Sequence, residues 1–237
     1  PLARCAVAPP VGCENVKPLV RRALRMVEAQ APPEKVRAAV SYADIWVPVP
    51  EDRAPLLDAS AGVRVEVWLD PTSPFSGPSL ESMGKVPKSG VGLVLRYLPD
   101  ADRGSADALA RGAVAAGLQG KAVEFLTAAE TWRSGAKDAR RKGEDPFAGA
   151  GVEAVAASLV ALGLDATRWE ADRNSPEVAA QIADDAQLAR VIGVRSVPTW
   201  FIDGYRLRGN QSDLALGRLV GLALEDAAAD AADAAGG

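Results

Sequence analysis

The stretch VRVEVWLDPTSPFS, residues 63–76, has the pattern of a β-strand that passes through a polar turn into the start of a helix. Valine at every second position gives the strand one apolar face. Ser73 has the residue type of a helix N-cap, and Pro74 would then take the first helical position, where a missing N–H costs nothing. Because α/β proteins commonly carry functional groups at such strand ends, the sequence predicts a site at residues 70–76.

Composition narrows the class of protein. The 237 residues suffice to bury a full core, and 48% hydrophobic with 24% charged residues is ordinary for a globular protein. A formal net charge of −4 argues against nucleic acid or an anionic membrane as the main partner. No apolar run approaches the length of a membrane span. The absence of histidine excludes Ser-His-Asp and Cys-His catalytic groups, and we expect no metal site.

The only cysteines, Cys5 and Cys13, flank a turn-forming stretch that contains two prolines and a glycine. Such an isolated pair indicates either a local disulfide or, in a reducing compartment, a dithiol. Their spacing matches no zinc or redox motif. We favour a structural disulfide between Cys5 and Cys13, which indicates an oxidising compartment.

Helical and extended patterns alternate along the chain. The sequence predicts helices over residues 15–27, 36–43, 79–85, 102–118, 121–132, 151–162, 166–173, 176–192 and 212–223. It predicts strands over residues 45–47, 63–69, 91–98, 199–203 and 205–208, the last two joined by a hairpin turn. Residues 133–150, with the basic run at 140–142, are expected to form a charged loop, to which we assign no function.

This order predicts an α/β fold in which helices cover a mixed sheet. We expect an N-terminal cysteine-bearing helical extension at residues 1–54 and a core in two pieces, 55–102 and 174–226. A helical insertion separates the two pieces at residues 103–173. Residues 227–237, rich in alanine and aspartate, are expected to form a flexible tail.

Two segments resemble a known family. GVRSVPTWFIDG, residues 193–204, resembles the segment of thioredoxin-like proteins that carries a cis-proline, and residues 70–76 resemble the turn that holds their Cys-x-x-Cys motif. Together with the helical insertion, residues 55–225 are similar to the DsbA family of thiol-disulfide oxidoreductases. The resemblance implies a thioredoxin-like fold of the DsbA type and a cis bond before Pro198.

The same resemblance implies a groove for a polypeptide substrate. Its residues would be Pro74 and Phe75 from the first segment and Val197 and Pro198 from the second. Trp200 and Tyr205 are candidates for its apolar edges, although their place in strands favours the core.

The chain departs from the family at the catalytic pair, where it has Ser73 and Ser76. Thiol–disulfide exchange needs a thiolate, and a helix N-terminus lowers the pKa of the first cysteine to supply it. A serine hydroxyl has a far higher pKa and forms no disulfide. The family also often has a buried acid six positions before its first cysteine; here that position is Val67, while Glu66 is expected to face the other way. We therefore expect no redox activity at positions 73 and 76.

Three hypotheses remain for the function. The first is a non-redox member of the DsbA family that binds polypeptides, in a chaperone-like role. The second follows from the likeness of SPFS, residues 73–76, to the Ser-Pro-(Tyr/Phe)-Ser turn of kappa-class glutathione transferases and 2-hydroxychromene-2-carboxylate isomerases, whose first serine stabilises the glutathione thiolate. The third is an oxidoreductase that is active in its natural form, with the two cysteines exchanged for serines by engineering in this chain.

We favour the first hypothesis. The cysteine-bearing extension and the proline-rich connection at residues 47–55 resemble exported DsbA-type proteins, and Gly77-Pro78 stands where the glutathione enzymes have an aromatic residue. The expected partner is a polypeptide, with no nucleic acid, no membrane span and no cofactor, glutathione being required only by the second hypothesis. The expected location is outside the cytoplasm, in the periplasm.

Overall fold

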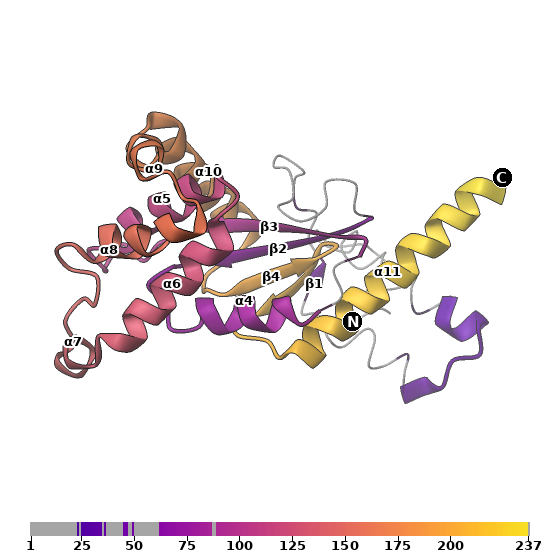
Figure 1. The fold of residues 1–237 in the computed structure, drawn as a ribbon. Helices are drawn as coiled ribbons and strands as arrows, with labels where there is room; N and C mark the ends of the chain where they lie inside the picture. The colour runs from indigo at the N-terminus through magenta and orange to yellow at the C-terminus, as the bar shows by residue number, and fades with distance from the viewer. Residues whose placement is uncertain are drawn as a thin grey trace. The chain divides into compact units, whose positions relative to one another are not determined.

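The fold is known from a computed structural model, which describes residues 23, 25–34, 36, 45–46, 49, 62–86 and 89–236 (Figure 1). Cys5 and Cys13, and with them the expected disulfide, lie outside the described residues. The same holds for most of the two helices predicted before residue 44. No helix of the described part is both long and apolar enough to cross a membrane.

Among the described residues, five strands form one mixed sheet: β1 (Ile45–Trp46), β2 (Val63–Leu69), β3 (Val91–Tyr97), β4 (Thr199–Ile202) and β5 (Tyr205–Arg208). Their order in the sheet is β1-β5-β4-β2-β3. The short strand predicted at residue 45 is confirmed at the sheet edge, where Ile45 pairs with Arg206 in antiparallel register. Almost every residue of β2 and β3 is buried. Both faces of these strands are therefore covered, which explains their high content of valine and leucine.

The register of β2 and β4 brings two distant segments to one end of the sheet. The N–H of Asp203, just after β4, donates to the carbonyl of Arg64, near the start of β2, at 2.7 Å. Since β2 and β4 are neighbours, this bond makes them antiparallel. The end of β2 therefore lies beside the start of β4.

The described helices and their bounds are α4 (Ser76–Gly84), α5 (Ala106–Gly117), α6 (Ala122–Gly135), α7 (Lys137–Lys142), α8 (Gly151–Ser158), a 3-10 turn (Val160–Leu162), α9 (Ala166–Arg173), α10 (Pro176–Ile192) and α11 (Asp213–Gly236). The starts predicted at 166 and 176 are confirmed. Asp165 and Ser175 act as N-caps and accept the N–H groups of Arg168 and Val178 at 3.0 and 3.2 Å. Gly193 ends α10 in the left-handed conformation, with φ of 74°.

The chain divides into two compact units, each with its own core. The first unit comprises residues 1–66, 85–94 and 200–237, and there α11 buries Leu216, Leu219 and Val220. The second comprises residues 67–84 and 95–199. In it α5 packs against α6 and α9, and Gly112 lies so close to the Phe125 ring that a Cβ would come within 2.7 Å of it. Helices α5 to α9 all fall within the segment predicted as a helical insertion.

The structure corrects two of the predicted boundaries. The final helix does not stop at residue 223 but continues to Gly236, through the residues expected to form a flexible tail. Alanine has the highest helix propensity, and no glycine or proline interrupts residues 222–235. The predicted charged loop also contains α7, whose alanine, lysine and arginine residues favour a helix before Gly143 ends it with φ of 72°.

Candidate functional site

The turn after β2 is closed by backbone and serine hydrogen bonds. The N–H of Ser73 donates to the carbonyl of Asp70 at 2.9 Å, and the N–H of Ser76 donates to the carbonyl of Ser73 at 3.2 Å. The hydroxyl of Ser76, which is buried, donates to the same carbonyl of Asp70 at 2.6 Å. The proton of Ser76 is thus used to hold the turn together.

Ser73 does not cap a helix, contrary to the prediction. Helix α4 begins at Ser76, so Pro74 lies in the turn rather than at a first helical position. This start places Pro78 in the first turn of the helix, where N–H groups have no helical acceptor, and the preceding Gly77 has no Cβ to clash with the proline ring. Gly77 also lets α4 approach α6, because a Cβ there would lie 2.5 Å from Cγ of Glu130.

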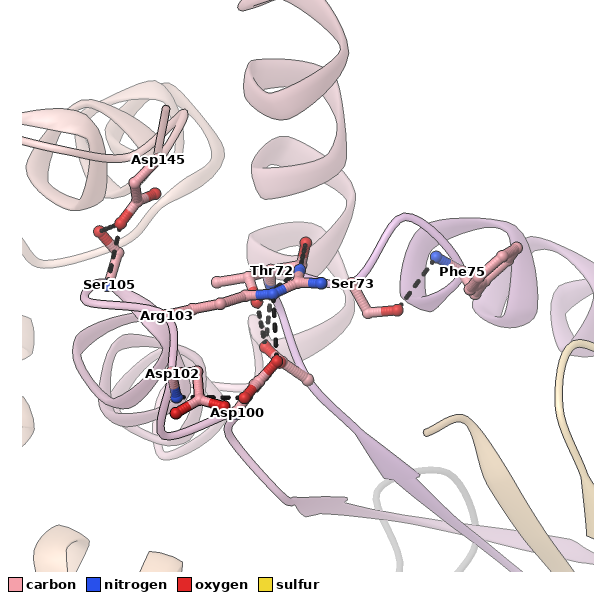
Figure 2. A network of polar contacts seen from close by, with 9 residues as sticks. Thr72, Ser73, Phe75, Asp100, Asp102, Arg103, Ser105 and Asp145 are labelled. Atoms are coloured by element: carbon pink, nitrogen blue, oxygen red, sulfur yellow. Dashed lines mark hydrogen bonds and ion pairs between the residues drawn. The ribbon is translucent and has the colours of Figure 1, made fainter. Parts of the chain in front are cut away.

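The hydroxyl of Ser73 instead accepts the N–H of Phe75 at 3.3 Å (Figure 2). No acceptor for its own proton occurs among the described residues. Ser73 is 7% exposed, whereas the Phe75 side chain beside it is 51% exposed, and Pro74 is exposed as well. The turn therefore presents an apolar ring to solvent next to a hydroxyl that has a proton to donate.

A polar cluster holds the turn from the side of β3. The carboxylate of Asp70, 2% exposed, accepts the N–H and the hydroxyl of Thr72 at 2.8 and 2.7 Å and the N–H of Asp100 at 3.2 Å. Arg103 donates to the carbonyl of Thr72 at 3.1 Å and pairs with the Asp100 carboxylate at 3.2 Å. Figure 2 shows the Arg103 side chain reaching from the loop after β3 to this turn.

The sequence interpretation included Asp70 and Thr72 in the predicted site at residues 70–76 without giving them a role, and it missed Asp100 and Arg103. A signal for them existed, because Pro99 ends the neighbouring strand and a polar loop with Asp100 and Arg103 follows. The N–H of Leu98, after β3, donates to the carbonyl of Leu69, at the end of β2, at 2.9 Å. The ends of β2 and β3 thus meet at one edge of the sheet, and this brings together the polar groups that follow the two strands.

The second predicted segment lies at the start of β4. The Val197–Pro198 peptide bond is cis, the geometry that the family resemblance implies. Pro198 is buried and Val197 half-buried, and the hydroxyl of Thr199 donates to the carbonyl of Ser196 at 2.6 Å. Because the start of β4 lies beside the end of β2, Pro198 and the serine turn occur at the same end of the sheet.

Trp200 and Tyr205 belong to the core. They are 0% and 3% exposed, as their place in strands predicts, so neither forms an apolar edge of the site. The position where the family often has a buried acid, Val67, is fully buried here. Its neighbour Glu66 is buried too, and its carboxylate lies 2.6 Å from Nε of Arg64.

The turn offers a hydrogen-bond donor and exposed apolar surface. It combines the Ser73 hydroxyl, the exposed Phe75 ring and the backbone around Pro198. No group of three or more metal-ligating side chains occurs among the described residues. The role of Ser73, Pro74, Phe75, Ser76, Val197 and Pro198 in binding a substrate stays a prediction.

Comparison with known proteins supports the fold. The family model of the DSBA-like thioredoxin domain matches residues 85–216, a match that begins after the serine turn. A search of curated proteins found no match.

Solved structures are similar over most of their length. A thioredoxin-like oxidoreductase from Silicibacter pomeroyi DSS-3 is 24% identical, with a TM-score of 0.56, covering 71% of this chain and 90% of that one. A periplasmic thioredoxin-like protein from Salmonella enterica serovar Typhimurium is 15% identical, with a TM-score of 0.56 and coverage of 70% and 86%. Wolbachia pipientis alpha-DsbA1 is 13% identical, with a TM-score of 0.60 and coverage of 78% and 96%. The predicted thioredoxin-like fold of the DsbA type is confirmed.

Proposed function

Because the chain belongs to the family of DSBA-like thioredoxin domains, we propose that it is a member that binds polypeptides without exchanging disulfide bonds. The observation that carries the proposal is the pair Ser73 and Ser76 in the turn where the family resemblance places the cysteine pair. We place the protein outside the cytoplasm, in the periplasm, the location named for the similar Salmonella protein.

The chemistry of serine supports a loss of redox function. Disulfide exchange proceeds by attack of a thiolate on a disulfide, and no hydroxyl replaces it in that role. The chain has no histidine to activate Ser73 as a nucleophile. The Ser76 hydroxyl already donates to the carbonyl of Asp70, so it serves the turn and not a substrate.

The groups at the turn suit the binding of an extended chain. The Phe75 ring, half exposed, offers apolar surface to a substrate side chain. The Ser73 proton is directed at no protein acceptor among the described residues and suits a peptide carbonyl. The cluster of Asp70, Thr72 and Arg103 holds the turn in place before a ligand arrives, which lowers the entropic cost of binding.

A binding experiment with the full chain tests the proposal. The probe is a reduced, carboxymethylated polypeptide with a fluorescent label, which is unfolded and has no thiols. We expect binding that Phe75→Ala weakens at least about tenfold, since burial of such a ring contributes about 1.5–3 kcal/mol. The matched control is Val191→Ala, which removes an apolar side chain that is 77% exposed on α10, and it should bind like the original chain.

Redox assays provide the complementary test. The chain should not catalyse the reduction of insulin by dithiothreitol, and clear catalysis would refute the proposal. The double variant Ser73→Cys/Ser76→Cys should gain a reducible thiol pair and catalyse that reduction. A double variant that folds but stays inactive would show that more than the two sulfurs separates this chain from its redox relatives.

Glutathione binding is a second candidate function, favoured by the unused proton of Ser73. A hydroxyl donor stabilises a thiolate, as the likeness of residues 73–76 to the glutathione enzymes implies. In that case the chain would bind glutathione, and Ser73→Ala would abolish binding while Ser76→Ala would not. Titration calorimetry distinguishes the two candidates, because a polypeptide-binding member leaves glutathione unbound.

A further inference from the structure

A groove between α6 and α8 is independent of the serine turn. It has a volume of about 610 Å³. Its lining consists mainly of small and apolar residues, namely Ala128, Thr131, Trp132, Gly135, Ala136, Ala154, Val155 and Ser158. The lining residues of α6 recur at helical spacing over two turns, so they form one continuous stripe. Small side chains on both walls let the backbone of another helix approach closely.

Trp132 is the largest side chain in the groove, and it is held in one position. Its indole N–H donates to the carbonyl of Pro146 at 2.9 Å. Gly151, at the start of α8, lies close to the ring, because a Cβ there would be 3.2 Å from the indole nitrogen. The side chain is nevertheless 40% exposed. A large aromatic group that is both fixed and exposed is typical of the anchor of a protein interface.

A basic helix continues directly from the groove. Helix α7 begins at Lys137, immediately after the lining residue Ala136, and carries further exposed cations at 140–142. Arg141 pairs with Asp138 at 3.1 Å, but Lys137 and Arg140 have no acidic partner within the described part of the chain. In a chain of net charge −4, this is a local excess of positive charge beside an apolar groove.

We propose that the α6/α8 groove binds an amphipathic acidic helix of a partner protein. Its apolar face would cover Trp132 and the small residues, and its acidic residues would face Lys137 and Arg140. The α6 stripe runs from residue 128 to residue 135, roughly 10 Å, so it accommodates about two turns of the partner helix. Charge complementarity selects an acidic partner, and the helical walls fit the helix-in-groove mode of recognition.

The test uses the full chain and two labelled peptides of about 14 residues, the length of a short stable helix face. One peptide has alanine and leucine on one face and glutamate on the other, and its twin has lysine in place of glutamate. We expect the acidic peptide to bind, and Lys137→Glu/Arg140→Glu to weaken binding roughly tenfold. Trp132→Ala should weaken it by a similar factor. The matched control Arg190→Glu reverses an exposed cation on α10 and should leave binding unchanged.

Circular dichroism shows whether each variant keeps its fold, and the exposed charge reversals are expected to do so. Equal binding of both peptides, no binding of the acidic one, or binding that ignores the double reversal overturns the proposal. Two further results overturn it in favour of another occupant. Binding to anionic vesicles that the reversal abolishes would assign the groove to a lipid surface. Self-association that the reversal abolishes would assign it to a second copy of this chain.

Discussion

Two regions of the second unit contain the same three groups, an arginine, a carboxylate and a tryptophan, but the carboxylate is buried in one and about half exposed in the other. In the buried cluster, Arg96 pairs with Asp185 at 3.2 Å and its guanidinium lies 5.2 Å from the centre of the Trp68 ring. Both charged side chains are at most 1% exposed. Asp185 also accepts the N–H of Tyr97 at 3.0 Å, so the carboxylate ties α10 to β3.

The partly exposed cluster is built around Arg173, which is 15% exposed, and the buried Trp169 ring. The Arg173 guanidinium lies 4.6 Å from the centre of the Trp169 ring and pairs with Glu170 and Glu153, each at 2.8 Å. The two carboxylates are about half exposed. A hydrogen bond from Arg173 lowers the pKa of Glu170, and burial opposes this effect without reversing it. For Arg173, burial alone would lower the pKa, but the bonds to Glu170 and Glu153 raise it.

Burial, rather than the type of contact, decides what such a cluster does. Water reaches the carboxylates of the partly exposed cluster and screens its charges, so a carboxylate that loses Arg173 stays solvated. In the buried cluster, a charge that loses its partner has no water to replace it. The contacts are alike in the two clusters. We nevertheless expect loss of the buried carboxylate to lower the free energy of unfolding severalfold more than loss of Arg173.

The largest effect is expected for Asp185→Ala, which leaves the Arg96 guanidinium buried without this carboxylate. We expect a loss of about 3–5 kcal/mol in the free energy of unfolding, measured by urea denaturation. The control Arg96→Met/Asp185→Leu replaces both charges by apolar groups and should recover most of that loss. A loss below about 1 kcal/mol for Asp185→Ala would show that water reaches the cluster.

Asp70→Ala should have the next largest effect on the free energy of unfolding. This variant tests the burial of a carboxylate that has no arginine partner among the described residues. Its carboxylate is 2% exposed and accepts three hydrogen bonds, so its removal leaves buried donors unpaired. We expect a loss of about 1–3 kcal/mol, measured as above. Asp70→Asn, which keeps an acceptor oxygen for Thr72, should lose less. Equal losses for both variants would attribute the effect to charge rather than to hydrogen bonding.

A smaller effect is expected for Arg173→Ala, at about 1 kcal/mol, from two exposed ion pairs and the contact with Trp169. Addition of 1 M salt, at which the screening length is about 3 Å, should reduce the difference from the original chain. The effect of Asp185→Ala should persist at that salt concentration. A difference for Arg173→Ala that salt leaves unchanged would indicate that packing of the arginine stem, and not charge, is responsible.

The smallest effect is expected for Glu170→Gln, and it should depend on pH. Since the folded-state pKa of Glu170 lies below its ordinary value of 4.5, ionised Glu170 stabilises the fold above that pH. The contribution is lost as the pH falls from 4.5 through the lowered pKa. Denaturation at pH 7 should therefore show a small difference between the two chains, and denaturation at pH 3 a smaller one. A difference that grows on acidification would contradict the direction of the shift.

Several elements of the site were predictable from sequence. The strand at residues 63–69, the serine turn and the proline before β4 follow from patterns within a few residues. The N-caps Asp165 and Ser175 were equally predictable from sequence, because the capping bond joins residues three apart. The start of α4 was not predicted correctly, because serine and proline at 73–74 and glycine and proline at 77–78 both suit a helix start, and local signals did not choose between them.

From the sequence alone follow the residues available at the turn, because the chain contains no histidine and has serines at positions 73 and 76. The sequence also determined the helices and strands whose signals lie within one or two turns of the chain. Only the tertiary structure decided that Arg103 holds the turn at Thr72, and that Asp185 pairs with Arg96, 89 residues away. The physical reason is that sterics and capping act over a few bonds, whereas the partner and the solvent exposure of a charge depend on segments that only folding brings together.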